Sequence, residues 1–171
     1  MSRVAIPLNK GPTLQTPPEL IDDFLVAEKR ATRFRWVKGG NPEFVRARSR
    51  LKVENRPELN GTAFFTAHLF RFPYKYSFLL SFKNERVLAL DVEPGRSYRN
   101  IITGISVSGT HWQTWPLLEA ETDARDLPHK LWFFEFVKRA KVCYPHVYKA
   151  PPFGQQLRMP GLGEECAPPA R

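Results

Sequence analysis

The stretch FVRARSRLKVE, residues 44–54, alternates apolar or small residues with cations over most of its length. A period of two places successive side chains on opposite faces of a β-strand. One set would face a core and contains Val45, Ala47, Ser49, Leu51 and Val53. The other set would face outward and contains Arg46, Arg48, Arg50 and Lys52. We therefore expect a half-buried strand with a cationic outer face.

Four further runs have strand character because they are rich in β-branched and aromatic residues. They are Thr62–Phe70, Tyr76–Phe82, Arg86–Val92 and Ile105–Trp115. The links between them are short, as at Asn55–Gly61 and at Lys83-Asn84-Glu85. Short links join antiparallel neighbours. The sequence thus predicts a five-stranded, mostly antiparallel meander sheet.

Two helices are expected to flank this sheet, which makes the fold class α+β. The first has Thr16 as its cap, Pro17 at its first position and Glu19 at the capping-box spacing, and would run to about Ala31. The second has Asp126 as its cap. Its apolar side would contain Leu131, Phe134, Val137 and Ala140, widened by Trp132, Phe133 and Phe136.

The length of 171 residues suits one domain with a real core. Residues 1–15, with Pro7 and Pro12, are expected to form an extended arm, and residues 16–143 a single α+β domain. Residues 144–171 are rich in proline and are expected to be extended or disordered.

Several classes of protein do not fit the composition. No window approaches the roughly 18 apolar residues that span a bilayer, and the first residues lack the apolar core of a signal peptide. The two cysteines, Cys143 and Cys166, form no CxxC motif, so neither a disulfide framework nor a cysteine zinc site is expected. We expect a cytoplasmic protein with no membrane contact, no metal and no cofactor.

The net charge of +9 favours a polyanionic partner, either nucleic acid or an acidic protein surface. From Lys29 to Lys52 there are nine lysines or arginines, Arg33 and Arg35 among them, against the single acid Glu43. Alternate cations on one strand lie about 7 Å apart, close to the spacing of phosphates. Guanidinium groups bind phosphate oxygens in pairs. An ordinary solvated sheet face is the alternative.

A second group of candidate residues follows the strand that ends at Asp91. A Pro94-Gly95 turn comes next, and Arg96, Arg99 and His111 lie beyond it. His111 is a candidate general base, while Arg96 or Arg99 could stabilise negative charge on a phosphate. His111 and Gln113 are expected to share a strand face.

Two aromatic residues near this group, Tyr98 and Trp112, are candidates for stacking on bases. Ordinary packing in the sheet is the alternative for them and for His111. A metal site is not expected, because only His111 and Asp91 are candidate ligands. A two-histidine ribonuclease mechanism lacks a second local histidine, since His129 falls on a predicted helix and His146 in the tail.

The order of these elements resembles a group of uncharacterised small bacterial proteins. The matching parts are Leu88-Ala89-Leu90-Asp91, the Pro/Gly turn, Asn100 and the G-x-H-x-x-x-W run from Gly109 to Trp115. Leu25–Ala31 and Phe133–Val142 look like that group's flanking helices. A more distant resemblance is to TumE-type toxins of toxin–antitoxin pairs, which implies action on RNA. The resemblance covers roughly residues 19–142.

The chain departs from that group's pattern of R-x-D, H-x-N and H-x-H. Tyr98-Arg99-Asn100 stands where the pattern has H-x-N, and His111-Trp112-Gln113 where it has H-x-H. Two of three signature histidines are absent. The resemblance therefore implies either an inactive relative or a fold used for binding.

Three hypotheses of function follow. The first is a small basic protein of a bacterial mobile element or toxin–antitoxin locus that binds nucleic acid, RNA before DNA, through the arginine-rich strand. The second is a protein-binding module, such as an inhibitor or subunit of a host defence complex. The third is a ribonuclease-like toxin that uses His111.

Overall fold

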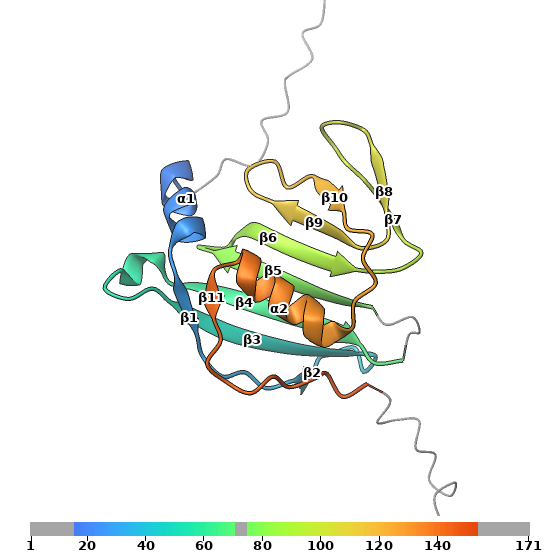
Figure 1. The fold of residues 1–171 in the computed structure, drawn as a ribbon, viewed down its shortest axis with the longest axis horizontal. Coiled ribbons are helices and arrows are strands. Elements are labelled where there is room, and N and C mark those ends of the chain that lie inside the picture. The colour runs from blue at the N-terminus through green and yellow to red at the C-terminus, as the bar shows by residue number, and fades with distance from the viewer. Residues whose placement is uncertain (1–15, 71–74, 154–171) are drawn as a thin grey trace, which may run out of the picture.

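The computed structural model describes residues 16–70 and 75–153 (Figure 1). The predicted arm, residues 1–15, and the part of the predicted tail beyond residue 153 lie outside the described residues. The elements in chain order are α1 (Pro18–Val26), β1 (Lys29–Ala31), β2 (Val37–Lys38), β3 (Phe44–Lys52), a 3-10 turn (Pro57–Leu59), β4 (Gly61–His68), β5 (Tyr76–Phe82), β6 (Glu85–Val92), β7 (Ser97–Arg99), β8 (Ser106–Ser108), β9 (His111–Thr114), β10 (Ala120–Thr122), α2 (His129–Arg139) and β11 (Val142–Cys143).

The main sheet has the strand order β10-β9-β6-β5-β4-β3-β1-β11, and β2 also pairs with β3. All of its strand pairs are antiparallel except β1 with β11. The α+β class with two helices and a mostly antiparallel sheet is confirmed. The predicted number of five strands is wrong, since the described residues form a nine-stranded sheet. The additional strands are two or three residues long, too short to show a period.

The last predicted strand, Ile105–Trp115, is in fact two strands. Gly109, with φ +77°, separates β8 from β9. Strand β8 pairs with β7 in a separate hairpin, whereas β9 pairs with β6 in the main sheet. A positive φ is a conformation that glycine adopts without steric cost. The chain therefore turns at Gly109, between the hairpin and the main sheet.

Both helices are shorter than predicted. Helix α1 ends at Val26 because Lys29 pairs with Val142 of β11, and the Lys29 Nζ donates to the carbonyl of Ala27 at 2.6 Å. Neither Thr16 nor Asp126 is the residue before a helix: Pro17 precedes α1, and Pro128 precedes α2. Proline supplies the extended backbone needed there but no side-chain cap.

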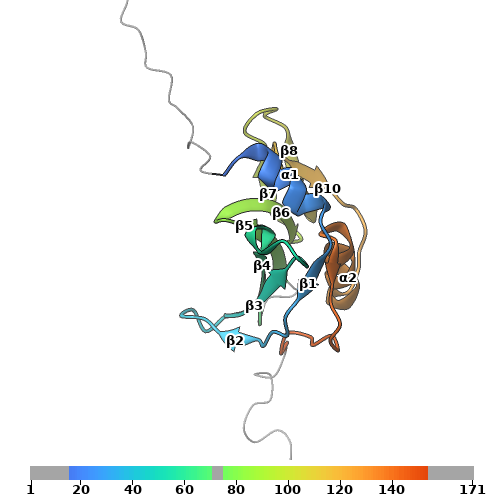
Figure 2. The same ribbon diagram turned by 90° about the vertical axis from the view of Figure 1, so that its left-hand side faces the viewer.

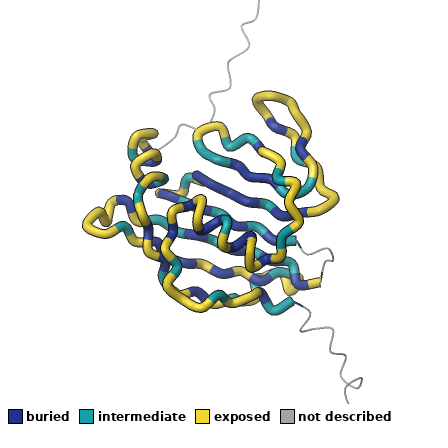
Figure 3. The backbone as a smooth tube through the Cα atoms, in the orientation of Figure 1, coloured by how far each residue is buried: buried dark blue, intermediate teal, exposed yellow. Residues whose placement is uncertain are grey.

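The core lies between the sheet and the helices, and α2 lies on one side of β3–β6 (Figure 2). Buried residues run along the central strands and recur along α2 (Figure 3). Phe78 and Phe136 stack at 5.5 Å, and Phe24 of α1 stacks on Phe82 at 4.5 Å. Helix α2 buries Trp132, Phe133, Phe136 and Val137, while Leu131 and Phe134 are exposed, contrary to the predicted stripe.

The first part of the predicted tail, residues 144–153, forms no helix or strand but lies against the domain. Tyr144, Tyr148 and Phe153 pack against the core. The indole Nε1 of Trp36 donates to the carbonyl of Lys149 at 2.9 Å. None of the described helices has the length and apolar character that crossing a membrane requires.

Candidate nucleic-acid interface

The register of the sheet places side chains in rows on the face opposite α2, which we call the open face. One row crosses five strands and contains Arg46, Thr66, Ser77, Asp91 and His111. The next row contains Arg48, Phe64, Leu79, Ala89 and Gln113. Antiparallel pairing brings directly opposed residues to the same face. The open face therefore joins the arginine-rich strand to the residues around His111.

The four cations of β3, which we call the cationic row, are Arg46, Arg48, Arg50 and Lys52. All four are exposed, and the residues between them are buried, so the predicted alternation is confirmed. Within residues 16–70 and 75–153, none of them forms an ion pair. Other arginines of the protein are paired: Arg56 bonds Asp23 at 3.0 Å, and Arg125 bonds Asp123 at 2.7 Å.

Three residues of the cationic row, Arg48, Arg50 and Lys52, line a hollow of about 380 Å³ that Lys83 also lines. Beside it, the guanidinium of Arg48 lies 5.6 Å from the centre of the Phe64 ring. An arginine over an aromatic ring gives an amphipathic surface on which a base can stack. This end of the open face combines positive charge with an aromatic ring.

Arg33 and Arg35 are exposed, but they lie on the connection between β1 and β2 and outside the cationic row. Burial raises the pKa of Tyr144, and the positive charge of Arg33 opposes that rise. Arg33 is therefore close to the C-terminal segment. The sequence predicted these two arginines as part of the interface because it could not show where the chain turns.

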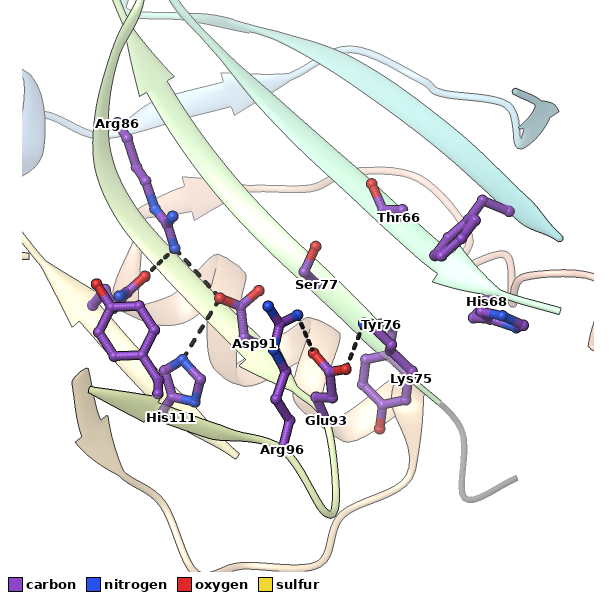
Figure 4. A pocket seen from close by; sticks show the side chains of 13 residues that line it. Thr66, His68, Lys75, Tyr76, Ser77, Arg86, Asp91, Glu93, Arg96 and His111 are labelled. Atoms are coloured by element: carbon purple, nitrogen blue, oxygen red, sulfur yellow. Dashed lines mark hydrogen bonds and ion pairs between the residues drawn. The ribbon is translucent and has the colours of Figure 1, made fainter. Parts of the chain in front are cut away.

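A cavity of about 360 Å³ occupies the other end of the open face (Figure 4). It brings together four predicted site residues, Asp91, Arg96, Tyr98 and His111. The sequence did not single out Lys75, Arg86, Glu93 and His68, which also line it. Glu93 could have been found, because it lies two residues after Asp91 and so falls on the same face. Arg86 could not, because a β-bulge after Leu80 shifts its register.

Arg99 lies outside this cavity, contrary to the prediction. It is exposed on β7, where it alternates with Tyr98, so the two side chains point to opposite faces of the hairpin. Tyr98 instead stacks against His111, with ring centres 5.5 Å apart. Of the two arginines proposed to stabilise negative charge, only Arg96 is in place.

His111 is held on both sides of its ring. Its Nδ1 is 2.9 Å from the carbonyl of Gly109, which can only accept a hydrogen bond, so Nδ1 carries the proton. Its Nε2 faces Oδ2 of Asp91 at 3.7 Å. Arg86 donates to the same Oδ2 at 3.4 Å and also to Oε1 of Gln113. As predicted, His111 and Gln113 share a face.

Glu93 is the second carboxylate of the cavity. Lys75 donates to its Oε1 at 2.5 Å, and Arg96 donates to its Oε2 at 3.2 Å. Burial raises the pKa of Glu93, but these two hydrogen bonds outweigh it and hold the pKa below its usual value. The cavity thus contains a fixed negative charge between two cations.

The cavity contains a second histidine, His68, which the sequence reasoning missed. Its Nδ1 accepts a hydrogen bond from the backbone N–H of Phe70, so its Nε2 carries the proton and faces Glu43 at 3.5 Å. The register separates it from His111 by three strand steps, about 14 Å at the usual spacing of strands. Two histidines that far apart do not reach one phosphate group.

Trp112 faces away from the cavity, which corrects its prediction as a stacking residue. It is 4% exposed, its Nε1 donates to Asp123 at 3.0 Å, and Arg139 lies 4.6 Å from its ring centre. It alternates with His111 and Gln113 along β9, so it points into the core while they point to the open face. The two-residue period of a strand places the Trp112 side chain on the face opposite to that of His111 and Gln113.

Within the described ranges, no group of three or more His, Cys, Asp or Glu side chains is arranged to hold a metal ion. The cavity is lined by cations, two carboxylates, two histidines and aromatic rings. In comparisons of the whole chain with known proteins, no family model, curated protein or solved structure matches it.

Proposed function

We propose that this protein binds single-stranded nucleic acid, RNA in preference to DNA, across the open face of its sheet. The observation that carries the proposal is the cationic row, four exposed cations without an ion pair among the described residues. Cations left unpaired on one strand can each replace a counterion at a phosphate.

The aromatic rings on the same face support a single strand over a duplex. Phe64 lies beside the cationic row, and Phe44 and Tyr98 line the cavity. Rings bind unpaired bases by stacking, whereas the bases of a duplex are already stacked on one another. Loops and ends of RNA present such unpaired bases. We propose that the protein binds them in the cytoplasm.

Binding without cleavage fits the geometry better than a ribonuclease does. His111 has a carboxylate partner, but the other histidine of the cavity is about 14 Å away by strand spacing. General acid–base catalysis requires each group within hydrogen-bond reach of the proton it transfers.

Fluorescence anisotropy with labelled single-stranded RNA tests the proposal. We expect affinity to fall steeply with salt, by about 0.7 log units per log unit of salt for each phosphate contacted. Arg48→Ala should weaken binding and reduce that slope. Lys130→Ala, which removes an exposed cation of α2, is the matched control and should change neither. Equal effects of the two substitutions would refute the proposal.

A protein-binding role, such as a subunit or inhibitor in host defence, is the second candidate, and one observation favours it. Ile101, Ile102 and Ile105 at the tip of the β7–β8 hairpin are 91%, 68% and 62% exposed. The backbone N–H groups of Ile102 and Thr103 donate to Glu119 Oε1 at 2.7 and 3.0 Å, which holds the tip in place. Contiguous exposed apolar groups mark interaction sites.

The double variant Ile101→Ser, Ile102→Ser separates the two roles. If the protein-binding role is correct, the wild type should capture a stoichiometric protein partner that survives nuclease treatment. The double variant should not capture it. RNA affinity should remain at the wild-type value, because the hairpin forms a two-stranded sheet separate from the main sheet that holds the cationic row. A partner captured equally by both forms would remove the hairpin tip from consideration.

A further inference from the structure

The open face is divided into two electrostatically different parts. The cationic row has no ion pair within the described residues, whereas the cavity contains the carboxylates of Asp91 and Glu93. A carboxylate repels a phosphate but accepts hydrogen bonds from N–H groups. Lys75, Arg86 and Arg96 pair with these two carboxylates. The cavity therefore offers paired charges and carboxylate acceptors, which suit a ligand group that carries N–H donors.

Asp91 is the carboxylate that a ligand can reach. Arg86 and His111 both approach its Oδ2, and its Oδ1 makes no hydrogen bond to the described part of the chain. Asp91 lies across from Ser77, beside Arg96 and Glu93 (Figure 4). Its side chain is 32% exposed, whereas that of Glu93 is 10% exposed and bonded at both oxygens.

We infer that the cavity is a subsite for an unpaired guanine of the bound strand, recognised by Asp91. Guanine has two adjacent donors on its Watson–Crick edge, N1–H and N2–H₂, and a carboxylate accepts both in parallel. Adenine, cytosine and uracil each lack this pair of donors. This inference rests on the proposed function, because the cationic row supplies the contacts to the phosphates.

The neighbours of Asp91 complement the rest of the base. Arg86, 3.4 Å from the Asp91 Oδ2, has further N–H groups that can donate to the guanine O6. The ring of Tyr98 supplies apolar surface for the base. Arg96, 68% exposed, donates to Glu93 and lines the same cavity. The volume of about 360 Å³ is within the range of ligand sites.

The test uses the whole protein and three oligonucleotides, U₈ RNA with one central guanosine, inosine or adenosine. Inosine lacks the 2-amino group of guanosine, and adenosine lacks both donors. We expect the guanosine oligomer to bind at least about 10-fold more tightly than the adenosine oligomer, with inosine between them. This ranking needs no protein variant, so it does not depend on whether a variant folds.

Asp91→Asn, which replaces one acceptor oxygen by a donor, should abolish the preference for guanosine. Asp22→Asn, at an exposed carboxylate of α1, should preserve it. Equal binding of the three oligomers, with salt dependence retained, would overturn the guanine subsite and leave the proposed function standing. A preference for adenosine would also overturn it. No binding of any oligomer at low salt would refute the proposed function and the subsite together.

Discussion

Nε2 of His111 on β9 lies 3.7 Å from Oδ2 of Asp91 on β6, and the register places these two residues directly opposite each other. The pair resembles the base and carboxylate of a hydrolase, but its surroundings differ. Tyr98 stacks on the imidazole, and Arg86 shares the carboxylate. The two residues therefore form part of the lining of the cavity, together with Tyr98 and Arg86.

We predict that the protein does not cleave single-stranded RNA, the ligand proposed for it. Single-stranded RNA incubated with the wild type and with His111→Ala should remain equally intact on a denaturing gel, because the second histidine of the cavity lies about 14 Å from His111 by strand spacing. Expression of both forms in a bacterial host should give equal growth. Cleavage by the wild type that His111→Ala abolishes would contradict this prediction and restore the ribonuclease hypothesis.

Phe64→Ala should weaken the binding of single-stranded RNA by about 5- to 150-fold, since stacking of one base on an aromatic ring contributes roughly 1–3 kcal/mol. Phe134→Ala is the matched control, because Phe134 is 42% exposed on α2, on the other side of the sheet. Anisotropy titrations at one salt concentration compare the two variants. Similar affinities for both would show that the Phe64 ring contacts no base.

Gly61→Ala should destabilise the fold by about 1–3 kcal/mol, the usual cost of overpacking a core. A Cβ at this position would lie 2.6 Å from Cζ of Phe24 and 2.9 Å from the carbonyl oxygen of Ser81. Gly40→Ala is the control, since a Cβ there meets nothing within 4 Å. Midpoints of urea unfolding report the difference, and equal midpoints would mean that α1 shifts at no cost.

The stability of the fold should fall in acid partly because of His129. Burial lowers the pKa of this histidine to about 3, and its Nδ1 is 2.5 Å from the hydroxyl of Tyr148. The unfolded chain takes up a proton near pH 6.5, whereas the folded chain does so only near pH 3. The contribution of neutral His129 to the free energy of unfolding is therefore fully present above pH 6.5. It is lost as pH falls toward 3, by at most about 1.4 kcal/mol per pH unit.

His129→Gln should flatten this part of the pH profile, measured as the free energy of unfolding in urea between pH 7 and pH 4. His146→Gln, at an exposed histidine, should leave the profile as it is in the wild type. Parallel profiles for all three proteins would show that burial does not hold His129 neutral.

The residues of β3 show how much of the site the sequence could predict. The alternation from Val45 to Lys52 required one buried and one exposed face, and the structure has both. Such local patterns are reliable because the direction of a strand side chain depends only on the backbone period. Where the pattern is two or three residues long, as in β1 at Lys29–Ala31, the sequence predicted the wrong element.

By itself the sequence determined the α+β class, the central meander and the cationic row, since each follows from period, turn residues or charge along the chain. Only the tertiary structure decided which polar groups meet in the cavity. Arg86 and Asp91 lie on β6, whereas His68 lies on β4. A bulge and the strand register bring their side chains to one face. It also decided which face of β9 packs in the core, and hence that Trp112 is buried there, and it decided that Arg99 lies outside the cavity. These outcomes depend on which strands pair, which no local pattern in one chain specifies.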